Sequence, residues 1–385
     1  MTGTYITGTY STLADEYDLP ERDLALHAVL GALEAADADP TAVDGLYLPK
    51  PRPWAKQGFF STLVSDRLGL SPARRLEVYT GGTSGGNAFH AAVSDVRAGR
   101  VGTAVVAAVE RNSTIGTADY FEYILDIFDR EFQAPAGPSI PGIYAQSLQR
   151  YCHEFDVDRE AVAAVAAKNR SNAATNPAAV FGSETTAGDV LDSRPVADPL
   201  RLAECPAPCD GAAALVVTGA DSPPDGAETP VRVSGVGAGH AASHLVGTRE
   251  GSLARFPAAG AAAESALSDA GTGVREVDVF EPYAPFAHVE AILTEELGLY
   301  DPGEGAAACA RGETAVDGAH PVSPSGGCLG RGHPAMVTPL LNYADAVAQL
   351  RGTAPNQVAG AERALTTSEH GHVDGVTATV LEVAQ

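Results

Sequence analysis

Lysine is scarce in this sequence of 385 residues, which contains only Lys50, Lys56 and Lys168. The 25 basic residues face 49 acidic ones, so the net charge is -24. Such an acidic excess argues against non-specific binding to nucleic acid or to an anionic membrane. It is typical of a salt-adapted, halophilic protein, because concentrated salt screens the repulsion between acidic groups. An ordinary acidic cytosolic enzyme is the alternative.

Long apolar runs are also lacking, and no run is long enough to span a bilayer. No basic segment followed by an apolar core marks the N-terminus, so we expect a cytoplasmic protein. The five cysteines are scattered and odd in number, which excludes a disulfide framework. Cys205 and Cys209 invite a metal interpretation, but no second ligand pair has suitable spacing. We therefore expect reduced thiols and no metal site there.

Strand-like and helix-like patterns alternate along the chain, which favours α/β layers. Residues 101–110 form a β-branched apolar run that is typical of a buried strand, whereas 221–229 is polar with paired prolines, as in a linker. Each side of this linker has an early strand, helices, a glycine-rich turn into a helix, and a closing strand. We predict two duplicated halves, an N-terminal one over 1–220 and a C-terminal one over 230–385.

The most informative stretch is Gly82-Thr-Ser84-Gly-Gly, between a predicted strand at 76–80 and a predicted helix at 87–98. Glycine permits positive φ angles, and a helix N-terminus stabilises an anion. Ser84 is therefore a candidate nucleophile. The alternative is a turn residue whose hydroxyl caps the following helix. The Gly-x-Ser-x-Gly pattern also fits the nucleophile elbow of a serine hydrolase.

Several segments, taken in order, resemble the thiolase superfamily, specifically its archaeal and sterol-carrier-protein-like branch. They are the Pro-Ser-Gly-Gly…Gly-His-Pro segment at 323–334, the strand-turn-helix-strand at 77–110, the helix and turn at 165–177, and the segment at 198–214. The resemblance covers nearly the whole chain. It implies a thiolase fold, in which two α/β halves form a five-layered αβαβα core with a loop domain inserted at about 115–197.

The sequence departs from the family at the positions that carry the chemistry. When the segments are aligned, the nucleophilic cysteine of thiolases falls on Gly82. The second family cysteine falls on His370, with His372 as the neighbouring possibility. Tyr283 replaces the residue that positions a water in the oxyanion hole of many thiolases. Only the histidine of the Gly-His-Pro motif, His333, is kept in type and place.

The resemblance implies acyl exchange on coenzyme A thioesters with no further cofactor. Ser84 would then hold the acyl group, His333 would take the Ser84 proton, and His370 or His372 would act as general acid and base. Backbone N–H groups of the Gly82–Gly86 turn would form an oxyanion hole, and Gly82 and Gly85 are candidate substrate-binding residues. Two further residues, Tyr283 and His288, could reach the pocket.

Four basic residues are candidates for binding the phosphates of coenzyme A. Lys168, Arg170 and Arg194 belong to the expected loop domain, and Arg331 lies beside His333. Each of them could instead be a solvated surface charge. The segment 370–374 also resembles part of a His-x-His-x-Asp metal motif. We expect no metal, because few residues follow it to complete such a site.

The sequence thus predicts an acetyl-CoA C-acyltransferase (β-ketothiolase) that condenses or thiolyses short-chain acyl-CoA through an acyl-Ser84 intermediate. Such an enzyme could serve polyhydroxyalkanoate or isoprenoid precursors, or fatty-acid breakdown. The resemblance implies a homodimer and a small, separately encoded OB-fold partner, with no nucleic acid or membrane partner. The alternatives are a degenerate acyl-CoA-binding scaffold and a serine hydrolase.

Overall fold

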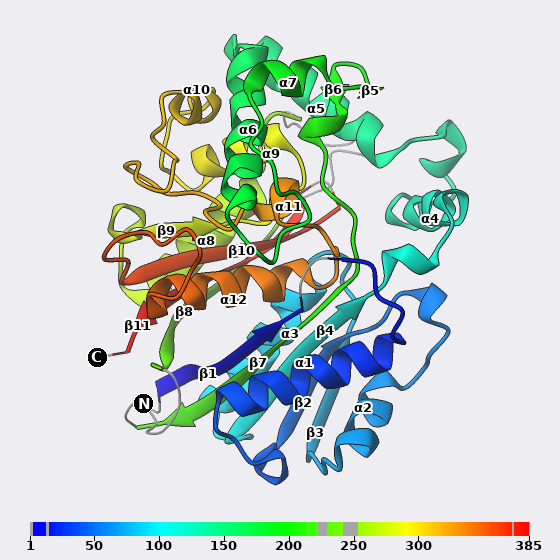
Figure 1. Cartoon of the computed structure of the whole chain (residues 1–385), viewed down its shortest axis with the longest axis vertical. Coiled ribbons are helices and arrows are strands. Elements are labelled where there is room, and N and C mark those ends of the chain that lie inside the picture. The colour runs from blue at the N-terminus through cyan, green and yellow to red at the C-terminus, as the bar shows by residue number, and fades with distance from the viewer. Residues whose placement is uncertain (1–2, 13–14, 222–228, 242–252, 372, 385) are drawn as a thin grey trace.

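The computed structural model describes residues 3–12, 15–221, 229–241, 253–371 and 373–384 (Figure 1). The strands are β1 Gly3–Ser11, β2 Gly45–Pro49, β3 Arg74–Val78, β4 Thr103–Glu110, β5 Pro195–Ala197, β6 Leu200–Arg201, β7 Gly211–Ala220, β8 Val231–His240, β9 Val279–Glu281, β10 Arg363–His370 and β11 Gly375–Val383. The helices are α1 Glu21–Ala35, α2 Phe60–Leu68, α3 Ser84–Arg97, α4 Thr117–Ile124, α5 Ile140–Phe155, α6 Arg159–Ala174, α7 Ala187–Asp192, α8 Pro257–Ala270, α9 Ala287–Glu296, α10 Gly305–Ala310, α11 Gly327–Gly330 and α12 Thr338–Arg351.

The main sheet has the strand order β3-β2-β4-β7-β1-β8-β11-β10-β9. It consists of an N-terminal part up to β1 and a C-terminal part from β8, joined antiparallel at Tyr5 with Arg232 and at Ile6 with Val231. The strands β2, β3 and β4 run parallel, as do β9 and β10, whereas β11 pairs antiparallel with both of its neighbours. The two parts of the chain therefore share one continuous sheet.

Side-chain alternation along β4 shows how the layers are held together. Val105, Ala107 and Val109 belong to the cluster under α1 and α2. Ala104 and Val106 face the opposite way, into the cluster around α3 and α12. A one-residue slip would exchange the two faces, and each fully buried valine contributes roughly 1.5–3 kcal/mol. The apolar pattern thus fixes the register of the strand.

Helices lie on both sides of the sheet parts (Figure 1). Helices α1 and α2 cover the N-terminal strands, α8 covers β8 and β11, and α3 contacts α12 between them. This is the predicted layered α/β architecture, which the structure confirms. The glycine turn follows β3, which lies where a strand was predicted, and leads into α3. The predicted strand-turn-helix setting is therefore also confirmed.

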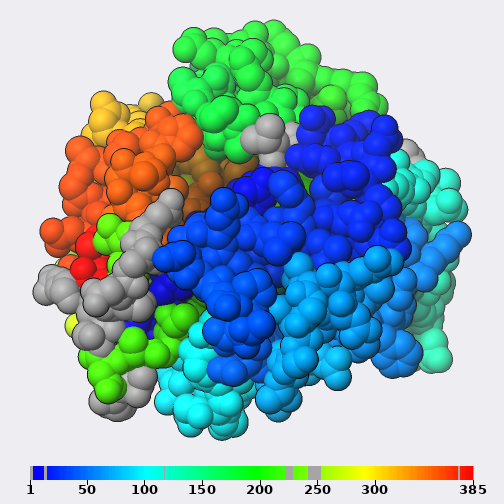
Figure 2. All heavy atoms as spheres, turned by 60° about the horizontal axis from the view of Figure 1, so that its bottom comes forward, coloured from blue at the N-terminus to red at the C-terminus, as the bar shows by residue number. Residues whose placement is uncertain are grey.

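The segment between β4 and β7 carries helices α4 to α7 and reaches over the C-terminal strands. Asp158 caps α6 by accepting a hydrogen bond from the backbone N–H of Glu160. Helix α6 then packs against α9, α10 and α11. In Figure 2 the residues coloured green rise above the blue N-terminal face. This segment therefore contacts the elements that carry the histidine loop.

The predicted linker at 221–229 falls mostly on residues outside the described ranges, and the division into halves stays a prediction. All five cysteines lie within the described ranges, and none of them forms a disulfide. Across those same ranges, no helix combines the length and apolar character needed to cross a membrane.

Candidate active site

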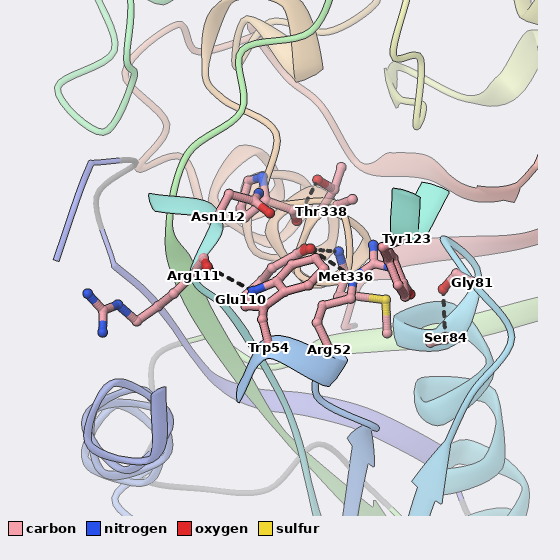
Figure 3. A network of polar contacts seen from close by, with 12 residues as sticks. Arg52, Trp54, Gly81, Ser84, Glu110, Arg111, Asn112, Tyr123, Met336 and Thr338 are labelled. Carbon is pink, nitrogen blue, oxygen red and sulfur yellow. Dashed lines mark hydrogen bonds and ion pairs between the residues drawn. The ribbon is translucent and has the colours of Figure 1, made fainter. Parts of the chain in front are cut away.

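The hydroxyl of Ser84 is taken up by its own turn. Its Oγ donates to the carbonyl of Gly81 at 2.7 Å and accepts from the backbone N–H of Thr80 at 2.8 Å (Figure 3). The residue is fully buried. The neighbouring Thr83 hydroxyl donates in the same way to the Thr80 carbonyl at 2.7 Å. These contacts favour the turn-residue interpretation of Ser84, and its role as nucleophile stays a prediction.

Gly82, where the cysteine of thiolases was expected to align, leaves no room for a side chain. A Cβ atom on Gly82 would lie 2.2 Å from the backbone oxygen of Glu369 and 3.2 Å from Cε1 of Tyr283. A contact of 2.2 Å with backbone requires the chain to shift. The space that a nucleophile on residue 82 would enter is therefore filled by the end of β10 and the Tyr283 ring.

Tyr283 and His333 meet beside this turn, although they lie on different loops. The Tyr283 hydroxyl is 3.5 Å from Nε2 of His333 and donates to the carbonyl of Ala335 at 3.2 Å. The side chain of Tyr283 is 3% exposed, and burial raises its pKa well above the usual value. The phenol therefore stays protonated at neutral pH and is available as a hydrogen-bond donor.

The hydrogen bonds around His333 define its tautomer. The Thr338 hydroxyl donates to the Pro334 carbonyl at 3.0 Å, so its oxygen is left to accept from Nδ1 of His333 at 3.1 Å. The lone pair then lies on Nε2, which faces Tyr283. Burial, together with the positive charges of Arg52 and Arg331, lowers the pKa of His333 to about 3. His333 is therefore neutral at neutral pH and suited to orient a donor.

A buried ion pair that the sequence analysis missed supports the histidine loop (Figure 3). Arg52 donates from Nε to Oε1 of Glu110 at 2.8 Å and from Nη1 to the Tyr123 hydroxyl at 2.6 Å. The other oxygen of Glu110 accepts from the backbone N–H of Met336 at 2.6 Å. The signal in the sequence was a glutamate that ends an otherwise apolar strand run.

His370 is also brought to the turn, from the end of β10. Its ring atoms Cδ2 and Nε2 lie 2.2 and 2.8 Å from the place of a Cβ on Gly81, whose φ is +60°. Its other ring nitrogen, Nδ1, lies 3.0 Å from Oδ1 of Asp374. The alternative residue, His372, lies outside the described residues. The sequence pattern marked Asp374 only as part of a metal motif. Among the described residues, no group of three or more His, Cys, Asp or Glu side chains could hold a metal.

Two of the predicted pocket or phosphate-binding residues belong to buried structural networks. His288 is fully buried in α9, with its ring centroid 5.9 Å from that of Tyr144. Arg331 is 3% exposed, and its guanidinium pairs with Asp345 and donates to Oδ1 of Asn342 at 2.9 Å. Both side chains are buried in packed surroundings, and their roles in the pocket or in phosphate binding stay predictions.

The other predicted binding residues have different surroundings. Lys168 donates to Oε1 of Glu290 at 2.6 Å and is 10% exposed, so its charge is paired, and its role in phosphate binding stays a prediction. Arg170 is partly buried, with its guanidinium 4.1 Å from the centre of the Phe181 ring. Arg194 is exposed and stays a candidate. Gly85 lies against Pro339 and Leu340 of α12, where it permits close helix packing.

Glu369, next to His370, is buried beside Tyr283 and Tyr144. Its Oε2 accepts from the backbone N–H of Val373 at 3.1 Å. Burial, with a smaller contribution from the charge of Asp374, raises its pKa from 4.5 to about 8. Its carboxyl group is therefore predominantly protonated and neutral at pH 7.

The raised pKa of Glu369 predicts a pH-dependent stability. Because the folded state holds this proton more tightly than the unfolded chain, stability falls as pH rises from 4.5 to about 8. The Glu369→Gln variant lacks this loss, which amounts to at most about 1.4 kcal/mol per pH unit. We expect its melting temperature to match the wild type near pH 5 and to exceed it at pH 9. If the melting temperatures of the variant and the wild type differed by the same amount at pH 5 and at pH 9, Glu369 would not be a buried group that titrates between them.

The geometry defines a class: a layered α/β protein whose glycine turn meets a tyrosine, two histidines and a glycine-rich loop. Residues 237–383 match the family model described as "Thiolase C-terminal domain-like". The chain is 34% identical over 353 residues to an acetyl-CoA acetyltransferase of Methanothermobacter thermautotrophicus, covering 91% of each. This chain therefore belongs to the thiolase superfamily.

Two further relatives carry names of another reaction class. The chain is 31% identical over 373 residues to 17-hydroxy-3-oxo-4-pregnene-20-carboxyl-CoA lyase of Mycobacterium tuberculosis, covering 91% of this chain and 92% of the lyase. The solved structure of the "Ltp2-ChsH2(DUF35) aldolase" superposes with a TM-score of 0.86 at 25% identity, over 99% of this chain and 98% of that one. The superfamily thus includes similar proteins named as transferases and as lyases.

Proposed function

We propose that this chain makes or breaks the carbon–carbon bond next to a coenzyme A thioester by proton transfer alone, as an aldol-type lyase. The observation that carries the proposal is the closed position at Gly82, where Glu369 and Tyr283 fill the space of a side chain. The hydroxyls of Thr83 and Ser84 are engaged with turn carbonyls. Gly82 has no side chain, and neither hydroxyl is free to hold an acyl group. The names of the lyase and aldolase relatives support the same reaction class.

Cleavage of a 3-hydroxyacyl thioester needs two proton transfers and no covalent intermediate. A base removes the hydroxyl proton, the C2–C3 bond breaks, and its electron pair forms the thioester enolate. The enolate is then protonated at C2, so the products are a carbonyl compound and a shorter acyl-CoA. His370 is the proposed base. Tyr283, whose hydroxyl donates to the Ala335 carbonyl and lies 3.5 Å from Nε2 of His333, is the proposed donor to C2.

The test supplies 3-hydroxybutyryl-CoA and longer 3-hydroxyacyl-CoA thioesters in the absence of free coenzyme A. We expect equal amounts of an aldehyde and a shortened acyl-CoA. An NADH-linked assay measures the aldehyde, and chromatography measures the acyl-CoA. Tertiary 3-hydroxy substrates should release ketones in the same way. The absence of cleavage across this panel, with and without a co-expressed partner, would contradict the proposal and favour the scaffold alternative.

Acyl transfer through Ser84 is the second candidate, because a 34%-identical relative is named acetyl-CoA acetyltransferase. In that reaction the Ser84 hydroxyl would leave the Gly81 carbonyl and attack the thioester, with its proton passing to His333. The same preparation distinguishes the two functions. Cleavage of acetoacetyl-CoA that requires free coenzyme A favours acyl transfer, whereas cleavage of a 3-hydroxyacyl-CoA without free coenzyme A favours the lyase.

We further propose that the chain works as a homodimer in concentrated salt, with a small separately encoded partner. The DUF35 component named with the similar aldolase supports such a partner. The net charge of -24 supports the salt requirement. We expect the melting temperature to rise as KCl is increased toward molar concentrations. A melting temperature that does not depend on salt would contradict the salt adaptation, and light scattering would show the oligomeric state.

A further inference from the structure

A histidine–carboxylate pair faces the glycine turn across from the Tyr283–His333 pair. The Nδ1 atom of His370 lies 3.0 Å from Oδ1 of Asp374, and the His370 side chain is 36% exposed. The opposite ring edge, with Nε2, lies against Gly81, whose missing side chain makes room for it. The pair therefore presents one nitrogen to the carboxylate and the other to the turn.

The backbone directly before Asp374 has an unfavourable conformation. Val373 has a φ of +57°, which is rare for a β-branched side chain and costs of order 1–3 kcal/mol. The strained turn is held by the hydrogen bond from the Val373 N–H to Glu369 and by the Tyr144 hydroxyl, which donates to the Gly371 carbonyl at 2.9 Å. Strain of this kind concentrates at functional sites.

The contact defines which nitrogen of His370 can act as a base. A carboxylate only accepts hydrogen bonds, so in the neutral imidazole the proton sits on Nδ1 and the lone pair on Nε2. The lone pair thus lies on the edge that faces the turn. When Nε2 takes a proton, the Asp374 carboxylate also stabilises the imidazolium that forms.

We propose that Asp374 is a positioning residue that holds His370 in the Nδ1–H tautomer, so that Nε2 receives the hydroxyl proton of the substrate. The inference deepens the proposed lyase function and rests on it. In the step, the substrate O–H proton moves to Nε2, the C2–C3 bond breaks, and its electron pair passes to the thioester enolate. Asp374 keeps its charge throughout.

Asp374→Asn is the direct test, since an amide can donate to Nδ1 and so support the wrong tautomer. We expect kcat for 3-hydroxyacyl-CoA cleavage to fall about 10² to 10⁴-fold, with little change in KM. Asp374→Glu should recover part of the lost kcat. Asp317→Asn, the same change at an exposed site, is the control and should leave kcat unchanged.

Ring ¹⁵N spectra at pH 8 test the pairing without any assay, with the His370 signals assigned from a His370→Gln sample. We expect the Nδ1–H tautomer in the wild type and a substantial Nε2–H population in Asp374→Asn. An Asp374→Asn protein that keeps the wild-type tautomer, or kcat within twofold of the wild type, overturns the inference. A wild type without lyase activity refutes the proposed function, while the spectra still decide whether Asp374 sets the tautomer.

Discussion

Tyr283→Phe is expected to lower kcat for carbon–carbon cleavage by about 10² to 10⁴-fold, the contribution typical of a positioned proton donor. The hydroxyl lost is the one between His333 Nε2 and the Ala335 carbonyl. The ring remains, so the contact with Gly82 and the fold should persist. KM should change little, because the proposed role of the hydroxyl is to protonate C2 after the carbon–carbon bond has broken. Steady-state kinetics with a 3-hydroxyacyl-CoA substrate measure both constants.

Tyr10→Phe is a matched control for this variant. The Tyr10 hydroxyl lies 2.8 Å from Nε2 of His27, so it forms a tyrosine–histidine contact at the surface. Removing it should leave kcat unchanged. If Tyr283→Phe also retained kcat within threefold while unfolding like the wild type, Tyr283 would not be the proton donor.

Gly82→Cys is expected to destabilise the protein and to create no thiolase. The new Cβ would lie 2.2 Å from the Glu369 carbonyl oxygen, so the turn or the end of β10 must move. Overpacking of this kind costs about 1–3 kcal/mol, and a backbone clash lies at the upper end of that range. The same movement displaces Tyr283 and His370, so cleavage activity should fall as well. Thermal unfolding and both enzyme assays measure these effects.

The control for the new cysteine is Gly182→Cys, where a Cβ would meet nothing within 4 Å. That variant should keep the wild-type melting temperature and activity. A Gly82→Cys protein of wild-type stability that cleaves acetoacetyl-CoA with free coenzyme A would contradict the closed position at Gly82. It would then favour the acyltransferase interpretation of the turn.

The sequence was sufficient for the layered fold and for the place of the glycine turn, because apolar periodicity and glycine positions are local signals. It was also sufficient to select His333 and His370, which the fold brings to that turn from distant segments. The resemblance supplied these two residues through motif order. Composition or spacing alone would not have distinguished His333 from a histidine that satisfies local backbone groups.

The role of Ser84 could not be predicted from the sequence alone. Its position in a Gly-x-Ser-x-Gly turn is the same for a nucleophile and for a turn residue, and only its hydrogen bonds to Gly81 and Thr80 distinguish them. The surroundings of Lys168 and Arg331 could not be predicted for a related reason. A sequence shows charge, but their carboxylate partners, Glu290 and Asp345, become visible only in the folded chain.

Asp374 and Glu110 illustrate the opposite error, since neither was selected as a site residue. Asp374 contacts His370 directly after Val373, which has a positive φ, and no residue propensity predicts that conformation for valine. Glu110 is satisfied by Arg52 and by a backbone N–H more than two hundred residues away along the chain. Long-range polar partners of this kind are set by tertiary packing.

The central claim is that this turn holds no covalent nucleophile, and the turnover of Ser84→Ala tests it most directly. Losing the hydroxyl removes the hydrogen-bond partner of the Thr80 N–H, which should cost about 0.5–1.5 kcal/mol of stability. We predict that the folded variant still cleaves 3-hydroxyacyl-CoA within a few-fold of the wild-type kcat. Loss of more than about 10³-fold in kcat, in a variant with the wild-type circular dichroism spectrum, would contradict the account.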